Sequence, residues 1–223
     1  SFVVGLIHTL RAMNGTLSSK KLLADEALRF EQDVLAETVG SQDQIAAAYG
    51  GFNNIIFNKD KSYSVNPVIA NQNRLKELNQ NLMLFFTGVT RFASDVAKIQ
   101  VNNTIENSSS LRVMSEQVDE ALSIIANPGQ SLDDFGRLLD DAWSLKRSLS
   151  NKVSSSFIDD IYQNAKSNGA LGGKLLGAGG GGFMLIYANP QSHVQIKESL
   201  NHLIHIPFEF ENSGSTISIY HPE

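Results

Sequence analysis

A run of glycines in the last quarter of the chain constrains its fold more than any other feature. Five of the six residues from Gly177 to Gly182 are glycine, and Gly172 and Gly173 come shortly before them. Glycine permits positive φ and lets a ligand or another backbone segment approach closely, at an entropic cost. This concentration predicts a tight loop that serves either close packing or ligand binding.

The residues around the loop exclude two familiar nucleotide motifs. Gly177, Gly179 and Gly182 satisfy G-x-G-x-x-G, but the dinucleotide fingerprint requires a helix directly after it. Here the apolar, β-prone run 183–187 follows, so the context is strand, loop and strand. No Gly-Lys-Ser/Thr closes the run, which excludes the Walker phosphate loop. A hairpin that packs under a helix without any ligand remains an alternative.

Composition sets broad limits on function. The chain has 223 residues, a formal net charge of −5 and no cysteine. The negative charge argues against nucleic-acid binding, and the lack of cysteine excludes disulfides, thiolate metal sites and a cysteine nucleophile. No signal peptide is readable, and no apolar run reaches the roughly 18 residues of a membrane span. We therefore expect a cytoplasmic protein with neither a nucleic-acid nor a membrane partner.

Hydrophobic periodicity and turn residues predict an α+β fold, because helices and strands mix without regular βαβ alternation. The Asn/Gln-rich segment 71–80 marks a domain seam, which gives predicted domains of 1–78 and 79–223. The predicted helices are 1–13, 19–37, 45–49, one after Gly88 that carries Arg91, 111–126, one from Ser131, 157–165 and 191–203. The predicted strands are 52–57, 63–65, 81–87, 174–176, 183–187, 206–210 and 216–220.

Two acidic positions could carry chemistry. Ser41 and Gln44 fit a capping box, which places Asp43 in the first turn of a helix, where the helix dipole favours the ionised carboxylate. Asp43 is then either a dipole-matching acid or a carboxylate that meets a substrate hydroxyl. Glu31 lies at the margin of the apolar face of helix 19–37, as do two other glutamates of that helix. Periodicity alone does not choose a functional acid among them.

Two segments carry a family resemblance. Residues 174–183, Lys-Leu-Leu-Gly-Ala-Gly-Gly-Gly-Gly-Phe, resemble the third motif of the GHMP kinases. Residues 40–53 are similar to the branch of sugar 1-kinases that act on D-glycero-D-manno-heptose 7-phosphate. The resemblance implies the GHMP kinase fold, with the remainder of an N-terminal domain followed by a ferredoxin-like C-terminal domain. It also implies that the chain is a C-terminal portion that lacks the first motif and most of the second.

The resemblance assigns roles to particular residues. It implies that Asp43 is the catalytic aspartate and that Glu31 binds Mg²⁺. Ser1, as the last serine of a phosphate loop, and the glycines of the third motif (Gly177, Gly179, Gly180, Gly181 and Gly182) would contact ATP. Arg91, Lys146 and Arg147 are candidates for a substrate phosphate, since basic side chains bind phosphate well. They could equally be surface cations near helix ends.

The implied activity is ATP- and Mg²⁺-dependent phosphorylation of the anomeric hydroxyl of the heptose 7-phosphate. A related fucose or galactose kinase is a second possibility. A non-catalytic ligand-binding fragment, in which the glycine hairpin serves only packing, is a third. The expected partners are a small sugar phosphate and ATP, and the sequence leaves the oligomeric state open.

Overall fold

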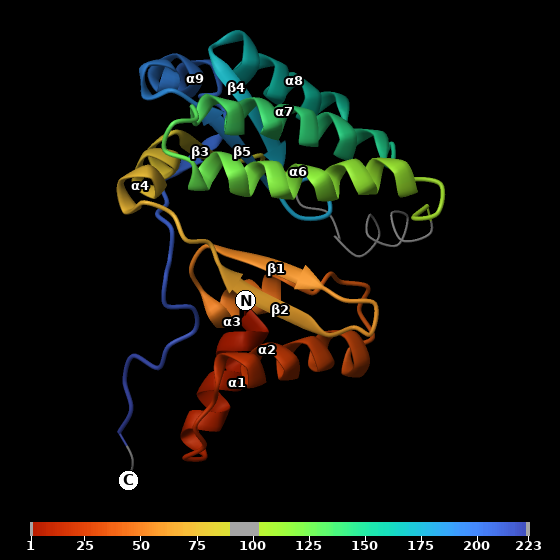
Figure 1. The fold of residues 1–223 in the computed structure, drawn as a ribbon, viewed down its shortest axis with the longest axis vertical. Helices are drawn as coiled ribbons and strands as arrows, with labels where there is room; N and C mark the ends of the chain where they lie inside the picture. The colour runs from red at the N-terminus through yellow and green to blue at the C-terminus, as the bar shows by residue number, and fades with distance from the viewer. Residues whose placement is uncertain (1, 90–102, 222–223) are drawn as a thin grey trace. The chain divides into compact units, whose positions relative to one another are not determined.

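The computed structural model describes residues 2–89 and 103–221 (Figure 1). The chain divides into two compact units, and each is described here by itself. The first unit comprises Ser1–Val68 together with Phe210–Glu223, and the second comprises Ile69–Glu209. The division falls earlier than the predicted boundary after residue 78, and the last residues of the chain group with the first unit.

The first unit is built from three helices and an antiparallel hairpin. The elements are α1 (Phe2–Met13), α2 (Lys20–Arg29), a π-helical turn η1 (Phe30–Val34), α3 (Gln42–Tyr49), β1 (Asn53–Phe57) and β2 (Tyr63–Pro67). Helix α2 packs against both α1 and α3. The core consists of apolar side chains from these helices, namely Val4, Leu23, Ala24, Ala27, Ile45 and Ala48.

The predicted helix 19–37 is shorter and ends differently from the prediction. Ser19 caps it as expected, because its hydroxyl accepts a hydrogen bond from the Leu22 amide at 3.2 Å. The α-helical pattern ends at Arg29 and continues only as the π-helical turn. Phe30 and Val34, two apolar residues of this segment, are 39% and 63% exposed. The change of period turns them away from the core.

The second unit contains a four-stranded antiparallel sheet in the order β4-β5-β3-β6. Its strands are β3 (Leu82–Phe86), β4 (Ala170–Leu175), β5 (Phe183–Ala188) and β6 (Ile204–Ile206). Its helices are α4 (Gln72–Gln80), α6 (Ser108–Ala126), α7 (Asp133–Ser148), α8 (Ser156–Ser167), the 3₁₀ turn η2 (Pro190–Ser192) and α9 (His193–Ser199). Helices combined with antiparallel sheets confirm the predicted α+β class.

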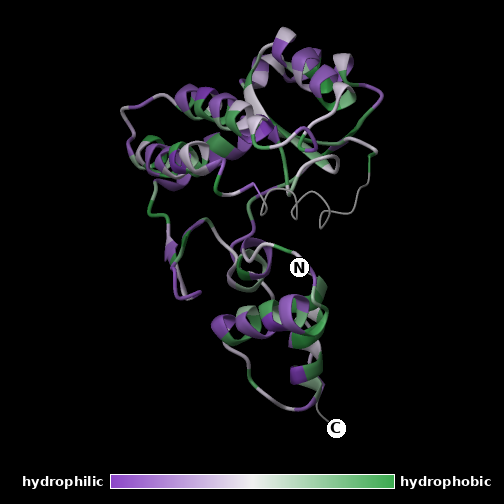
Figure 2. Cartoon of the chain, turned by 90° about the vertical axis from the view of Figure 1, so that its right-hand side faces the viewer, coloured by the Kyte–Doolittle hydropathy of each residue, from purple (hydrophilic) through white to green (hydrophobic). Residues whose placement is uncertain are grey.

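Helix α7 lies unusually close to the edge strand β4. A side chain on Gly172 would overlap the carbonyl oxygen of Gly136, so the helix and strand backbones meet directly. Trp143 of α7 is fully buried, with its ring near that of Tyr162 from α8. Figure 2 shows apolar and polar residues sharing the helices of both units, as expected for helices that bury one side. The core of the second unit therefore lies between the sheet and α7 and α8.

Several predictions of secondary structure differ from the structure. Segment 71–80, for which no helix was predicted, forms helix α4, and Asn71 caps it by accepting from the Asn73 amide at 2.9 Å. The predicted helix 191–203 is split into η2 and α9 and ends at Ser199. Residues 216–220 pair with no strand in the described part of the chain. The predicted helix that carries Arg91 lies outside the described residues.

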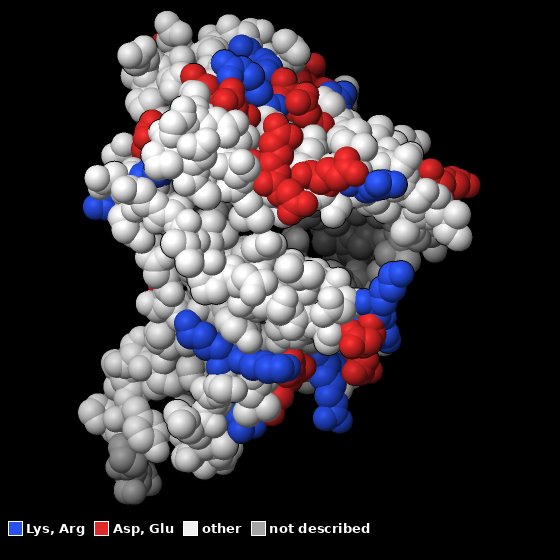
Figure 3. Space-filling view, in the orientation of Figure 1, with Lys and Arg blue, Asp and Glu red and all other residues white. Residues whose placement is uncertain are grey.

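The face of the second unit seen in Figure 3 is acidic over α6, where Glu116, Asp119 and Glu120 are exposed. Arg112 pairs with Glu116 at 3.1 Å and offsets only part of this charge. A surface of this sign repels polyanions rather than attracting them. No helix in the described ranges is both long enough and apolar enough to cross a membrane.

Candidate functional site

Asp43 lines a cavity of about 620 Å³ in the first unit. It lies in the first turn of α3, where unpaired backbone N–H groups favour a negative charge, and its side chain is exposed. The cavity is lined by Val4, Gly5, Asp43, Ala46, Ala47, Gly50, Gly51, Glu211, Gly214 and Ser215. The carboxylate is thus open to a ligand in this cavity.

The C-terminal residues 210–215 form one wall of this cavity. The Gly51 amide donates to the Glu211 carbonyl at 2.7 Å, and Ser215 Oγ lies 2.9 Å from His8 Nδ1. Gly214 has a φ of +69°, and a Cβ there would lie 2.6 Å from the carbonyl oxygen of Ala48. Only glycine therefore allows this close crossing. The chain end is bound to the segment that carries Asp43.

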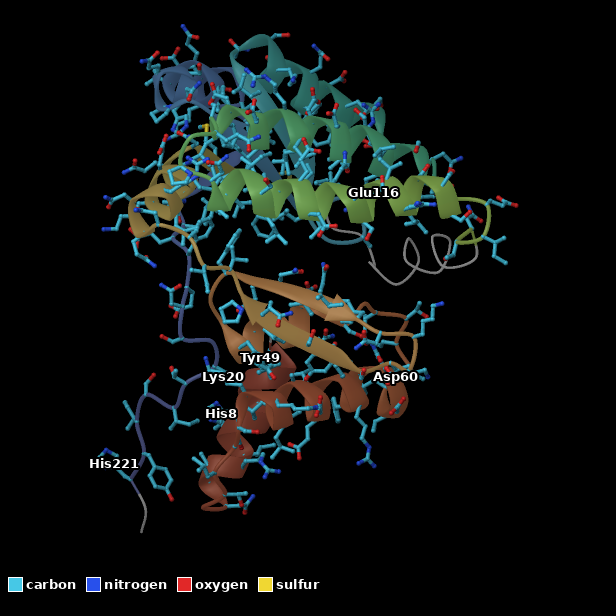
Figure 4. The ribbon with its side chains drawn as sticks, in the orientation of Figure 1. His8, Lys20, Tyr49, Asp60, Glu116 and His221 are labelled. Carbon is cyan, nitrogen blue, oxygen red and sulfur yellow. The ribbon has the colours of Figure 1, made fainter. Side chains whose placement is uncertain are left out.

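A second polar contact fixes the end of α3 (Figure 4). The Lys20 ammonium donates to the Tyr49 carbonyl at 2.5 Å, and Figure 4 shows these two residues side by side in the first unit. The carbonyl belongs to the last turn of α3, where a cation is favoured by the helix dipole. Helix α3 is therefore held near its C-terminal end by α2 as well as by the chain end.

Glu31 and the start of α3 meet through a side-chain hydrogen bond. Gln44, the neighbour of Asp43, is 3% exposed, and its Nε2 donates to Glu31 Oε2. Glu31 lies in the π-helical turn, a rare conformation that is frequent at functional sites. The predicted capping box is wrong, because Ser41 makes no capping bond and instead accepts from Gln32 Nε2 at 3.1 Å. The Gln44 amide group joins Glu31 to the first turn of α3.

The oxygen atoms around Glu31 fit Mg²⁺. Gln44 Oε1 is buried and has no hydrogen-bond partner in the described part of the chain. A carboxylate and an amide oxygen are ligands of the type that Mg²⁺ accepts, and it commonly uses few protein ligands together with phosphate and water. Within residues 2–89 and 103–221 there is no cluster of three or more His, Asp or Glu side chains that could hold a metal. Both groups are of the chemical type that Mg²⁺ accepts, and their binding of this ion stays a prediction.

The glycine loop connects β4 to β5 in the second unit and is held on both sides. Its amides at Gly180 and Gly182 donate to the carbonyls of Val153 at 2.9 Å and Val89 at 2.8 Å. The Gly182 carbonyl accepts from both the amide and the hydroxyl of Thr87, at 2.9 and 2.8 Å. The loop is a strand-loop-strand hairpin, as predicted. Of the loop glycines expected to contact ATP, Gly180 and Gly182 use their backbone amides to hold the loop in place.

The loop needs glycine for two physical reasons. Gly177, Gly179, Gly180 and Gly182 have φ values of +70°, +117°, +79° and +100°, which side chains rarely adopt. At Gly179, a Cβ would also lie 2.8 Å from the carbonyl oxygen of Val153. Close packing thus accounts for part of the glycine content. This agrees in part with the alternative of a hairpin whose glycines serve packing.

Lys146 and Arg147, both near the C-terminal end of α7, have different surroundings. Lys146 Nζ donates to the carbonyls of Leu175 and Gly177, at 3.1 and 2.5 Å. Burial, and secondarily the charge of Lys174, lowers the pKa of Lys146 to about 8. Arg147 pairs with Asp159 at 3.1 Å and lines a separate cavity of about 530 Å³ that is rich in serine. Of these two residues Arg147 is the exposed one, and its contact with a substrate phosphate stays a prediction.

The structure brings together some of the predicted residues. Glu31 bonds to Gln44, the neighbour of Asp43 in the chain, whereas Lys146 bonds to the glycine loop. Ser1 and Arg91 lie outside the described residues. Asp43 belongs to the first unit and the loop to the second, so their meeting in one cleft stays a prediction. Sequence reasoning missed Gln44 as the partner of Glu31, and it missed the chain end beside Asp43.

Residues 123–204, which include α7, the glycine loop and β5, match the family described as GHMP kinases C terminal. The structure resembles that of a D-glycero-D-manno-heptose 1-phosphate kinase from Bacteriodes thetaiotaomicron, with a TM-score of 0.72 and 23% identity. That match covers 98% of this chain and 61% of the other. The chain therefore has the GHMP kinase fold, and its residues 123–204 are similar to the C-terminal domain of that family.

Two related proteins indicate which branch of the family this chain resembles. The chain is 31% identical over 203 residues to the D-glycero-alpha-D-manno-heptose 7-phosphate kinase of Campylobacter jejuni, over 90% of this chain and 59% of that enzyme. It is 30% identical over 185 residues to the bifunctional fucokinase/GDP-fucose pyrophosphorylase of Arabidopsis thaliana, over 80% of this chain and 17% of that protein. The chain thus spans about three fifths of the length of the Campylobacter jejuni enzyme. Its resemblance to the heptose-phosphate branch of sugar kinases is confirmed.

Proposed function

We propose that the protein to which this chain belongs transfers the γ-phosphoryl group of ATP to the anomeric hydroxyl of a D-glycero-D-manno-heptose 7-phosphate. The observation that carries the proposal is the contact between Glu31 and Gln44, which places a second carboxylate beside the Asp43 turn. The identity of 31% to a heptose 7-phosphate kinase over most of the chain supports the choice of substrate.

The proposed reaction forms a bond between the sugar hydroxyl oxygen and the γ-phosphorus while the bond to the β,γ-bridging oxygen breaks. Asp43 orients the hydroxyl and accepts its proton, and ADP leaves with the bridging oxygen. In such transfers most of the rate enhancement comes from positioning and from stabilising charge. Glu31 and Gln44 would hold Mg²⁺, which neutralises charge on the phosphate oxygens when it is bound. Arg147 remains a proposed contact for the sugar phosphate.

The test is a phosphotransfer assay on the full-length gene product that contains this sequence. With ATP, Mg²⁺ and the heptose 7-phosphate, we expect Asp43→Ala to lower kcat by about 100-fold or more, as for loss of a group in proton transfer. Gln42→Ala is the matched control, because Gln42 is exposed in the same helical turn. Turnover of Asp43→Ala within about threefold of wild type would remove any chemical role for this carboxylate.

A fucose kinase is the second candidate, favoured by the 30% identity to the fucokinase fusion over 80% of this chain. A panel of heptose 7-phosphate, L-fucose and D-galactose separates the two, because the first substrate alone carries a phosphate that a basic side chain can bind. We expect kcat/KM to be highest for the heptose 7-phosphate. A preference for L-fucose would replace the proposed substrate and leave the kinase assignment intact.

A further inference from the structure

The two halves of the glycine loop are held by different partners. Its second half is held by the Gly180 and Gly182 amides and by Thr87, as described above. Its first half, from Leu176 to Gly177, leaves the end of β4 with one backbone bond across the hairpin, from the Leu176 amide to the Phe183 carbonyl at 2.8 Å. Gly177 and Leu176 are both exposed. A side chain of α7 also reaches this limb.

Lys146 supplies that contact from the neighbouring helix. Its ammonium donates to the Leu175 and Gly177 carbonyls, which lie on either side of Leu176. Hydrogen bonds from an ionised donor are shorter and roughly twice as strong as neutral ones. One side chain of α7 therefore joins the last residue of β4 to the first glycine of the loop.

The surroundings of Lys146 favour a contact with the backbone rather than with an acid. Among the described residues, no carboxylate forms an ion pair with Lys146, whereas the adjacent Arg147 pairs with Asp159. Lys146 is also desolvated, and Lys174 adds a second positive charge nearby. Burying a charge is unfavourable unless polar partners compensate for it. The two carbonyls are the partners that the described structure provides.

We infer that Lys146 is a positioning residue that fixes the first limb of the glycine loop, in place of the substrate-phosphate contact that the family resemblance suggested. The functional consequence rests on the proposed kinase activity: a loop fixed before ATP binds has less freedom to lose in the transition state. The structural part of the inference does not depend on any activity.

The structural part is tested by hydrogen exchange at pH 7 on the full-length gene product. In Lys146→Met we expect the amides of peptide 176–183 to exchange about tenfold faster or more, because bonds to a charged group are lost. Lys197→Met, at an exposed lysine of α9, is the matched control and should leave this peptide unchanged. Lys146→Arg keeps a cationic donor and should restore most of the protection, and it serves as the test if the methionine variant does not fold.

The kinetic part separates positioning from substrate binding. A positioning residue predicts that Lys146→Met lowers kcat about tenfold with the KM for the sugar phosphate within about threefold, whereas a ligand of that phosphate predicts a raised KM. Unchanged exchange in peptide 176–183, or a KM rise of tenfold without faster exchange, overturns the inference. If exchange is faster in Lys146→Met but the wild-type protein has no kinase activity, the bonds from Lys146 to the loop are supported and the proposed function is refuted instead.

Discussion

At the scale of single residues, the candidate site depends on side chains whose partners lie far away in the sequence. Asp43 could be proposed from a short local pattern, whereas Glu31 was assigned only through the family resemblance. Gln44 was misassigned, since its spacing from Ser41 fits a capping box as well as it fits any other role. The Gln44 side chain is buried and bonds to Glu31 instead of capping the helix. A spacing of three residues does not reveal whether a particular side chain is buried.

Lys146 carries a prediction about pH. Its pKa is lowered to about 8 from an ordinary value of 10.5, so the folded state disfavours the ammonium relative to the unfolded state. The unfolded chain therefore binds more protons between these values, and this group adds stability as pH rises from about 8 towards 10. We expect the unfolding free energy of wild type, relative to Lys146→Met, to increase between pH 7 and pH 9.5. Urea unfolding at both values measures the difference, and a difference that falls with pH would contradict the assignment.

At the scale of elements, long amphipathic segments were predicted well and polar ones poorly. Helix α6 and strands β3 and β5 match their predictions closely, because a sustained apolar pattern fixes both their type and their extent. Helix α4 was missed because Asn and Gln dominate it, although Asn71 caps it and Leu78 is buried. Residues 216–220 look like a strand but pair with no strand among the described residues, because pairing depends on the fold as well as on the segment.

The close packing of α7 on β4 predicts a large effect at Gly172. Adding a side chain there would overlap the Gly136 carbonyl oxygen and place a Cβ 2.8 Å from the Asp140 amide nitrogen, and both are backbone atoms that cannot rotate away. We expect Gly172→Val to destabilise the protein by about 3 kcal/mol or more, as for overpacked cores. Gly40→Ala is the control, since a Cβ at Gly40 meets nothing within 4 Å. Urea unfolding should separate the two, and equal midpoints would refute this packing.

At the scale of the whole molecule, the chain leaves the first unit near Val68 and returns to it at Phe210. The return places Glu211, Gly214 and Ser215 beside Asp43. No local pattern could have predicted this, because His8 and Ser215 are joined by a contact between opposite ends of the chain. The glycine loop was predictable as a strand-loop-strand hairpin because its glycines and flanking strand residues are consecutive, although the contacts that hold it come from distant residues.

The returning chain end predicts a selective effect of truncation. Ending the protein after Glu209 removes one wall of the Asp43 cavity, so we expect kcat/KM for the sugar to fall about tenfold or more while the second unit stays folded. Ending it after Ser218 removes the exposed residues Ile219, Tyr220 and His221 together with the last two residues of the chain, and serves as the control. Hydrogen exchange of β3 and β5 checks the second unit. Equal activity of the two truncated proteins would show that residues 210–218 do not shape the site.

The central claim is that the Asp43 carboxylate and the glycine loop act on the same phosphoryl group. Its most direct test is a crystal structure of the full-length gene product with a non-hydrolysable ATP analogue, Mg²⁺ and the heptose 7-phosphate. We predict Asp43 within about 3 Å of the sugar hydroxyl, with the backbone of 179–182 against the γ-phosphate on the other side of the same cleft. Coordinates that place the Asp43 carboxylate in a different cleft from the loop would contradict it.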